Sequence, residues 1–301
     1  MFRRQPLSRK VTVALLVALS FVCCSISCKR NAAEYGSVEV FDLSSAFLDK
    51  HMRIPVNLPS DYLLGGQYAI LYFIPYGGGG AGLVTQMTNS DAATVGVLRE
   101  RISEPLIIVG VPHDGSFLLD STPPHEAIMS TSGIRLSTGL YESYFLGEVI
   151  PQVERRYDLH PTAASRYIGG YSLGGYAALR IGLTHPELFS RIGAHSPTLF
   201  VDSLPDKIAA QFMYPTEKLR AQRDPLLLPL EKEALARTRV YIDTGAFDIN
   251  RQACELMHRR LTDAGVVSEL HILNGSHGLA YWQTHMPEYV EFYTSASVSM
   301  P

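Results

Sequence analysis

The stretch GGYSLGG, residues 169–175, places a serine between closely spaced glycines. Within it, Gly170-Tyr171-Ser172-Leu173-Gly174 matches G-x-S-x-G, the pattern of a serine on an abrupt turn from a strand into a helix. The context fits, because RYIGGY before the serine is typical of a buried strand and LGGYAALRIGLTH after it is typical of a helix. Ser172 is therefore a candidate nucleophile. The alternative, a serine that only caps the helix, does not require glycine on both sides.

A serine hydroxyl is a weak nucleophile at neutral pH and needs a base, an acid that orients the base, and donors for the oxyanion. His277 is the preferred base, because it lies in the loop NGSHG directly after SELHIL, the last predicted strand. From such a loop one imidazole nitrogen can reach the serine while the other meets a carboxylate. His195 follows the helix after Ser172 and comes too early for the chain order of nucleophile, acid and base.

The segment RVYIDTGAFDIN offers two candidates for the acid. Asp248 lies in the loop just beyond the predicted strand, where the carboxyl end of the sheet is expected, and we prefer it. Asp243 lies within or at the end of the strand and is the reserve candidate. Its alternative role is that of a strand-end residue that supports the loop.

Two backbone N–H groups are expected to bind the oxyanion. One is that of Leu173, directly after the nucleophile, and the second comes from a loop after an early strand. The glycine run Gly77–Gly80 is such a loop, since glycine lets the backbone turn its amides toward a ligand. We nominate Gly78 as this donor, and Gly79 is the next candidate. A phosphate-binding function of this run is disfavoured, because no Lys-Ser/Thr follows it and it is not G-x-G-x-x-G.

Apolar runs alternate with helical patterns along the chain, which predicts an α/β fold. SVEVFDL and HMRIPVNLP mix polar and apolar residues, as antiparallel edge strands do. Later runs are continuously apolar, as in parallel strands buried on both faces: QYAILYFIPY, PLIIVGVP, RYIGGY, RIGAH, RVYIDTG and SELHIL. Helical spacing recurs in YESYFLGEVIPQVERRYDL, in LGGYAALRIGLTH, and over residues 250–264 and 287–295. We expect a mostly parallel central sheet with helices on both faces.

A single α/β domain over residues 36–297 accounts for these patterns. Residues 197–237 interrupt the alternation and read as an irregular, proline-containing insertion. In such sheets ligands bind outside the carboxyl ends of the strands, so the insertion could shape a substrate site. A surface excursion with no role in the site is an equal alternative.

The N-terminus is expected to lie outside the fold. Arg and Lys residues precede the short apolar stretch VTVALLVALSFVCC, the pattern of an export signal over residues 1–27, with a short linker over 28–35. Cys23, Cys24 and Cys28 crowd its end, as in a bacterial lipoprotein signal with Cys28 as the acylated residue and membrane tether. An ordinary cleaved signal is an equal alternative. We expect an exported protein, either free in the periplasm or outside the cell, or lipid-anchored at the envelope.

The composition argues against several other classes of protein. The formal net charge is −3 and no block of Lys and Arg marks a nucleic-acid surface. The Cys and His positions show no zinc-like spacing, so no metal is expected, and no organic cofactor is implied. Beyond the signal region only Cys254 remains, which excludes a disulfide framework.

Beside these motifs, the chain resembles the putative-esterase family of α/β-hydrolases, which includes esterase D, feruloyl and acetyl-xylan esterases, enterochelin esterases and the antigen 85 mycolyltransferases. The resemblance runs from NLPSDY to AYW, through ILYFIPYGGGG, VGVPHDG, YESYFLGEVIPQVERRYDL, RYIGGYSLGGYAALRIGLTHPELF, GAHSP, RDPLLL, YIDTGAFD and NGSHGLAYW. It places the family's nucleophile on Ser172, its acid on Asp248 and its base on His277. Trp282 matches a family aromatic, although a core tryptophan is the preferred interpretation.

The chain departs from the family at Pro75-Tyr76, where many members have Leu-His directly before the glycines that supply the oxyanion donor. The resemblance implies the α/β-hydrolase fold and an exported serine carboxylesterase acting on a small-molecule or glycan-linked acyl ester. An acylated carbohydrate, a siderophore ester or an envelope lipid all fit, whereas the export signal argues against the cytosolic S-formylglutathione hydrolases. An antigen 85-type acyltransferase using the same triad is the nearest alternative, and a catalytically inactive exported binding protein is the second.

Overall fold

The computed structural model describes residues 35–59, 62–76, 106–128, 135–201 and 207–295, and these belong to one compact unit, Ala32–Pro301. The expected signal over residues 1–27, Cys28 and the glycines Gly77–Gly80, with both nominated donors Gly78 and Gly79, lie outside the described residues. Within the described ranges, no helix combines the length and the apolar character that a membrane crossing requires.

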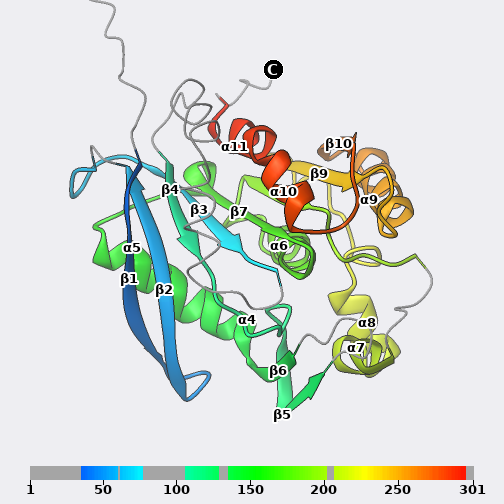
Figure 1. The fold of residues 1–301 in the computed structure, drawn as a ribbon, viewed down its shortest axis with the longest axis horizontal. Helices are drawn as coiled ribbons and strands as arrows, with labels where there is room; N and C mark the ends of the chain where they lie inside the picture. Colours follow the sequence, from blue (N-terminus) through cyan, green and yellow to red (C-terminus); the bar gives the residue numbers. More distant parts are fainter. Residues whose placement is uncertain (1–34, 60–61, 77–105, 129–134, 202–206, 296–301) are drawn as a thin grey trace, which may run out of the picture. The chain divides into compact units, whose positions relative to one another are not determined.

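An eight-stranded sheet with the order β1-β2-β4-β3-β7-β8-β9-β10 organises the molecule. Strands β4, β3, β7, β8, β9 and β10 pair in parallel, each with the next. Strands β1 and β2 form an antiparallel edge, as the sequence predicts. Figure 1 shows β1 and β2 at one end of this sheet and β9 and β10 toward the other. The strands are β1 (Tyr35–Ser45), β2 (Lys50–Pro59), β3 (Ala69–Ile74), β4 (Leu106–Gly110), β7 (Arg166–Tyr171), β8 (Arg191–His195), β9 (Arg239–Gly245) and β10 (Val267–Leu273).

Strand β3 divides its side chains between two apolar cores. Ile70, Tyr72 and Ile74 belong to one buried cluster, whereas Leu71 and Phe73 belong to the other. Because successive side chains of a strand point to opposite faces, the sheet is covered on both faces. The α/β class with helices on both faces is therefore confirmed.

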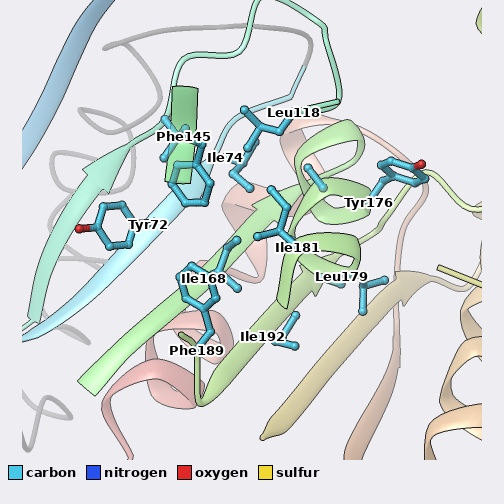
Figure 2. Packing of buried hydrophobic residues seen from close by; sticks show 14 of the residues in the cluster. Tyr72, Ile74, Leu118, Phe145, Ile168, Tyr176, Leu179, Ile181, Phe189 and Ile192 are labelled. Carbon is cyan, nitrogen blue, oxygen red and sulfur yellow. The ribbon is translucent and has the colours of Figure 1, made fainter. Parts of the chain in front are cut away.

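The helices fall into two groups that match these cores. The larger core takes apolar side chains from α4, α5, α6, α7 and α9, and the smaller one takes them from α10 and α11. Figure 2 shows part of the larger core, in which Leu179 and Ile181 of α6 lie near Ile168 and Ile192 of the sheet. The helices are α4 (Tyr141–Tyr144), α5 (Ile150–Arg156), α6 (Leu173–Thr184), α7 (Lys207–Met213), α8 (Glu217–Arg223), α9 (Arg251–Asp263), α10 (Leu279–Thr284) and α11 (Met286–Thr294).

The helix expected over YESYFLGEVIPQVERRYDL is interrupted by a π-helical turn, η1 (Phe145–Val149), between α4 and α5. Pro151 lies at the start of α5 and has no N–H, so the α-helical bonding of the preceding turn cannot continue through it. The helical pattern of the sequence is correct here, but the wide turn was not predicted.

The segment 197–237 is not irregular throughout, which corrects the expectation from its prolines. It contains α7 and α8, two short helices separated by Pro215. The side chain of Thr216 accepts a hydrogen bond from the N–H of Leu219 at 3.2 Å and so caps the start of α8. The structure also contains an unpredicted antiparallel pair, β5 (Asp120–Ile128) and β6 (Arg135–Leu140).

Candidate active site

Ser172 occupies the turn between β7 and α6 in a strained conformation. Its φ is +52° and its ψ is −113°, a region that residues with a side chain seldom adopt. Three backbone hydrogen bonds hold the turn: Ser172 N–H donates to His195 C=O at 3.1 Å, and the carbonyl of Ser172 accepts from the N–H groups of Tyr176 and Thr198 at 3.0 Å. The Ser172 side chain makes no capping bond to α6, so it is not serving as a helix cap.

The glycines around the serine are required by the neighbouring strand β3. A Cβ atom on Gly174 would lie 2.0 Å from the carbonyl oxygen of Ile74, and one on Gly170 would lie 2.5 Å from the same oxygen. Both contacts are with backbone, which cannot move aside as a flexible side chain can. The G-x-S-x-G spacing therefore lets the turn pack directly against the end of β3.

The structure brings Ser172, His277 and Asp248 together in one chain of hydrogen bonds. The Oγ of Ser172 lies 2.8 Å from Nε2 of His277, and Nδ1 of His277 lies 3.0 Å from Oδ2 of Asp248. The Asp248 side chain is fully buried, whereas the His277 side chain is 31% exposed. With Nδ1–H donating to the carboxylate, Nε2 is the acceptor that faces the serine hydroxyl.

Asp248 is held in the charged form by the donors around it. Besides His277, the hydroxyl of Ser196 donates to Oδ2, and the N–H of Asn250 donates to Oδ1 at 2.8 Å. Burial by itself raises the pKa of Asp248, but the hydrogen bonds from His277, Ser196 and Asn250 outweigh it and lower the pKa below the ordinary value. A buried anion with its lone pairs satisfied can orient the imidazole and stabilise its positive charge.

Sequence reasoning missed two hydroxyls at this site, those of Ser196 and Thr198. The Oγ of Ser196 also lies 3.0 Å from Nδ1 of His277, and Ser196 has a φ of +48°. The Oγ1 of Thr198 lies 3.0 Å from Oγ of Ser172. Both residues follow β8, which pairs with β7 in the sheet, so their position just after the strand RIGAH was the signal available in the sequence.

Asp243, the reserve candidate, has different partners. Its carboxylate is fully buried, and Oδ2 accepts from Nδ1 of His195 at 2.8 Å. Asp243 lies within β9 and pairs in register with His195 of β8, whereas Asp248 lies beyond the strand end, beside His277. The carboxylates of the two aspartates thus have different side-chain partners.

A cavity of about 410 Å³ opens onto the Ser172 hydroxyl. Its apolar lining includes two strongly exposed side chains, Phe247 and Ile249, at 77% and 79% exposure. Trp282 also lines the cavity, although it is buried and stacks on Tyr171 at 4.9 Å between ring centroids. The remaining apolar lining residues are Tyr76, Leu173 and Phe200, the last of which belongs to the segment 197–237.

Of the expected oxyanion donors, the structure describes Leu173, together with the end of β3 that leads to the glycine run. Leu173 is the first residue of α6, so its N–H lies in the turn whose amides have no partner within the helix. On the other side, Nε2 of His113 lies 2.9 Å from the carbonyl oxygen of Pro75, just before Tyr76 and the glycine run. Burial lowers the pKa of His113, which keeps this imidazole neutral and its Nε2–H a donor to the carbonyl.

Among the residues that the structure describes, no three His, Cys, Asp or Glu side chains gather in a way that could hold a metal ion. The described site brings together a serine, an imidazole and a carboxylate in series. Such a series can transfer an acyl group through the serine oxygen.

Several known proteins are similar to this chain. A family model described as "Putative esterase" matches residues 45–293. Esterase Rv1288 of Mycobacterium tuberculosis (strain ATCC 25618 / H37Rv) is 27% identical over 147 residues, which cover 48% of this chain and 28% of that protein. The chain thus matches little more than a quarter of that curated relative's length.

Solved structures share the fold. A ferulic acid esterase aligns with a TM-score of 0.68 at 20% identity, covering 87% of this chain and 98% of that one. FphF, a fluorophosphonate-binding serine hydrolase of Staphylococcus aureus, aligns with a TM-score of 0.66 at 18% identity, covering 87% of this chain and 99% of that one. The central sheet and its helices are therefore those of esterases with the α/β-hydrolase fold, as the sequence predicts.

Proposed function

This chain belongs to the putative esterase family, and from that premise we propose that it is a serine carboxylesterase with Ser172 as nucleophile, His277 as base and Asp248 as acid. The observation that carries the proposal is the chain of contacts from Ser172 Oγ through His277 to Asp248 at the edge of a cavity. The predicted order of nucleophile, acid and base along the chain gives the same three residues.

In the first half of the reaction, Ser172 Oγ attacks the carbonyl carbon of the ester while its proton passes to Nε2 of His277. The imidazolium then gives this proton to the departing alkoxide, which leaves as an alcohol, and the acyl group stays on Ser172. Asp248 holds the imidazole in the required tautomer and stabilises the imidazolium, since its carboxylate contacts Nδ1.

In the second half, water attacks the acyl carbonyl and its proton passes to Nε2 of His277. Collapse of the intermediate returns the proton to Ser172 Oγ and releases the carboxylic acid. The backbone N–H groups of Leu173 and Gly78 are the proposed donors to the oxyanion in both halves. The hydroxyl of Thr198, 3.0 Å from the nucleophile, can donate to Ser172 Oγ while Ser172 donates to His277.

The cavity favours an ester whose groups near the carbonyl are uncharged and apolar. Aromatic and aliphatic side chains dominate its lining, and among the described lining residues none is Lys or Arg. One structural neighbour is a ferulic acid esterase, and the acyl group of a ferulic acid ester is aromatic. A small-molecule or glycan-linked acyl ester of this kind fits the proposal, as does the ester of a siderophore.

Export completes the proposal. Its support is the basic start and the apolar stretch within residues 1–27, with Cys28 as the candidate lipid anchor. The enzyme would then meet its ester in the periplasm, outside the cell, or at the envelope surface. Cell fractionation, with labelling by a radioactive fatty acid and a Cys28→Ser control, tests both location and tether.

The decisive experiment is labelling of the mature protein with a fluorophosphonate probe, together with turnover of a series of aryl, feruloyl and acetyl-sugar esters. The wild type is expected to label at Ser172 and to turn over esters, and Ser172→Ala is expected to do neither. Full turnover by Ser172→Ala would contradict the mechanism. Adding a sugar alcohol as acceptor and analysing the products distinguishes hydrolysis from acyl transfer.

A further inference from the structure

A second pair of a histidine and an aspartate lies beneath the candidate active site. His195 is the last residue of β8, and Asp243 lies near the end of the neighbouring strand β9. The two residues pair with each other in register. Their side chains are fully buried, and Nδ1 of His195 lies 2.8 Å from Oδ2 of Asp243. The proposed reaction uses neither residue.

Three tyrosines complete this pair. The Tyr281 hydroxyl donates to Oδ1 of Asp243 at 2.7 Å, and the Tyr289 hydroxyl donates to the same oxygen at 3.1 Å. The Tyr293 hydroxyl lies 3.0 Å from Nε2 of His195. We call these five residues the His195–Asp243 cluster.

The donors of the cluster all lead to one carboxylate. Burial, and next to it the charge of Asp243, raises the pKa of Tyr281 and of Tyr289, so both hydroxyls stay protonated and donate. His195 donates through Nδ1–H, which leaves Nε2 to accept from Tyr293. Every polar side-chain atom named here therefore has a partner, as a buried polar network needs in order to be rigid.

Two glycines of the sheet make room for this arrangement. A Cβ atom on Gly169 of β7 would lie 1.9 Å from the Tyr293 hydroxyl oxygen, and one on Gly193 of β8 would lie 1.8 Å from it. Two adjacent strands thus lack side chains where that hydroxyl approaches. The cluster is built into the sheet and is not an incidental contact between helices.

Backbone contacts join the cluster to the nucleophile. The carbonyl of His195 accepts from the N–H of Ser172 at 3.1 Å, and the carbonyl of Asp243 accepts from the N–H of Ser196 at 3.0 Å. Ser196 in turn contacts Asp248. The same residues whose side chains form the buried pair therefore fix the backbone beneath the catalytic hydroxyl and beside the acid.

The residue that follows Tyr281 in the chain contacts the base. Tyr281 lies in α10, four residues after His277, and its neighbour Trp282 packs against the His277 ring at 5.4 Å between centroids. Gly278, with a φ of +150°, separates His277 from this helix. The His277 side chain is 31% exposed, whereas the buried Tyr281 hydroxyl, four residues later, is hydrogen-bonded to Asp243 in the sheet.

We propose that Tyr281, through its hydrogen bond to the buried Asp243, is a positioning residue that holds the His277 loop at the correct distance from Ser172. Tyr289 and Tyr293 contribute to the stability of the His195–Asp243 cluster and have no part in this positioning. The kinetic test of this inference rests on the proposed esterase function, because it measures the turnover of an ester. The cluster is not a second catalytic site, because His195 and Asp243 are fully buried and neither lines the cavity at Ser172. A small displacement of the base lowers the rate of the chemical step. Loss of the positioning contact should therefore lower kcat and leave KM almost unchanged.

Tyr281 and Tyr289 provide a matched pair of variants. Both hydroxyls are buried and donate to the same carboxylate oxygen, but only Tyr281 belongs to the helix after His277. Tyr281→Phe should lower kcat by about tenfold or more with KM within about twofold. Tyr289→Phe should leave kcat within about twofold, while the two variants lower the melting temperature by similar amounts.

Equal losses of kcat in the two variants, or none in Tyr281→Phe, would overturn the inference. If Tyr281→Phe does not fold, Ala280→Gly replaces it, because this exposed residue of α10 lies between His277 and Tyr281 outside the cluster. Its added backbone freedom should lower kcat by about threefold or more without raising KM. An unchanged kcat in Ala280→Gly would then count against the inference.

A readout without substrate separates this inference from the proposed function. In protein labelled with ¹⁵N-histidine, the proton on Nδ1 of His277 should exchange with water faster in Tyr281→Phe than in the wild type or in Tyr289→Phe. A wild type that neither turns over esters nor labels at Ser172 would refute the esterase proposal alone. Equal exchange rates in all three proteins would refute the positioning role alone.

Discussion

The Oγ of Ser196 lies 3.0 Å from Nδ1 of His277, and its hydroxyl donates to the same oxygen of Asp248 that His277 contacts. The carboxylate oxygen thus receives two donors, and the imidazole N–H has two oxygens beside it. Ser196 extends the series of serine, histidine and aspartate by a fourth side chain, which comes from the end of β8.

In Ser196→Ala, the charged Asp248 carboxylate should contribute less to the free energy of unfolding than it does in the wild type. The variant lacks one of the hydrogen bonds that lower the pKa of Asp248, so we expect a loss of about 2 kcal/mol in the free energy of unfolding at neutral pH. A carboxyl whose folded-state pKa is lowered contributes stability above its unfolded pKa of about 4, and this contribution is lost as the pH falls through the folded value. The difference between wild type and variant should therefore shrink in acid.

Urea unfolding from about pH 7 down to about pH 3 measures this difference. Ser190→Ala is the control, because the Ser190 hydroxyl donates to the uncharged carbonyl of Ala164, and its effect should not change with pH. A difference between wild type and Ser196→Ala that stays constant over the whole range would show that Ser196 does not act on the charge of Asp248.

Asp248→Asn should abolish most of the activity. An amide at this position favours the wrong imidazole tautomer, so kcat should fall by about 10³- to 10⁴-fold with the fold retained. Asp224→Asn is the matched control, since Asp224 is also buried but bonds to Arg220 and to the N–H of Leu226, away from the cavity. It should cost stability and leave kcat within about twofold. Comparable losses of kcat in both variants would argue against Asp248 as the acid.

Gly174→Ala should be far more damaging than an alanine at another helical glycine. Its Cβ would lie 2.0 Å from the backbone oxygen of Ile74, so we expect a loss of about 3 kcal/mol or more in the free energy of unfolding. In Gly147→Ala the new Cβ would meet only the ring of Phe47, a partly exposed side chain, at 3.0 Å. That variant should change stability by about 1 kcal/mol at most. Urea unfolding compares them, and equal stability would contradict the packing argument.

Phe247 and Ile249 should determine the preference for long acyl chains. Replacing both with serine removes apolar surface at the mouth of the cavity, so kcat/KM for an octanoyl aryl ester should fall by about tenfold more than for the acetyl ester. The control is the double replacement of Leu63 and Leu64 by serine, since this pair is similarly exposed, at 72% and 71%, but does not line the cavity. An unchanged chain-length profile would show that the acyl group binds elsewhere.

The elements that a local pattern defines could be predicted from the sequence. The turn at Ser172 depends on glycines two residues away on each side, and the strand and helix around it have their own periodicity. The positions of Asp248 and His277 could be predicted as well, because each lies in the loop after a strand that an apolar run indicates. The carboxyl ends of parallel strands lie at the same edge of the sheet, so these loops were expected to be close together.

The parts that depend on which strands are neighbours could not be predicted. Ser196 and Thr198 carry no pattern of their own, and their contacts arise because β8 lies next to β7 in the sheet. The pairing of His195 with Asp243 depends on the register between β8 and β9, which spacing does not encode. The short helices α7 and α8 were missed because Pro215 separates them and other prolines flank them in this segment, so no long helical pattern is visible.

Strands β7, β8, β9 and β10 are consecutive both in the sheet and in the chain, and Ser172, the proposed nucleophile, precedes His277, the proposed base, by 105 residues. A ribosome therefore completes the serine turn long before it synthesises the histidine. An unfinished polypeptide that stops before β10 has the Ser172 hydroxyl but not the imidazole proposed to take its proton, so the proposed chemistry requires translation to pass residue 277.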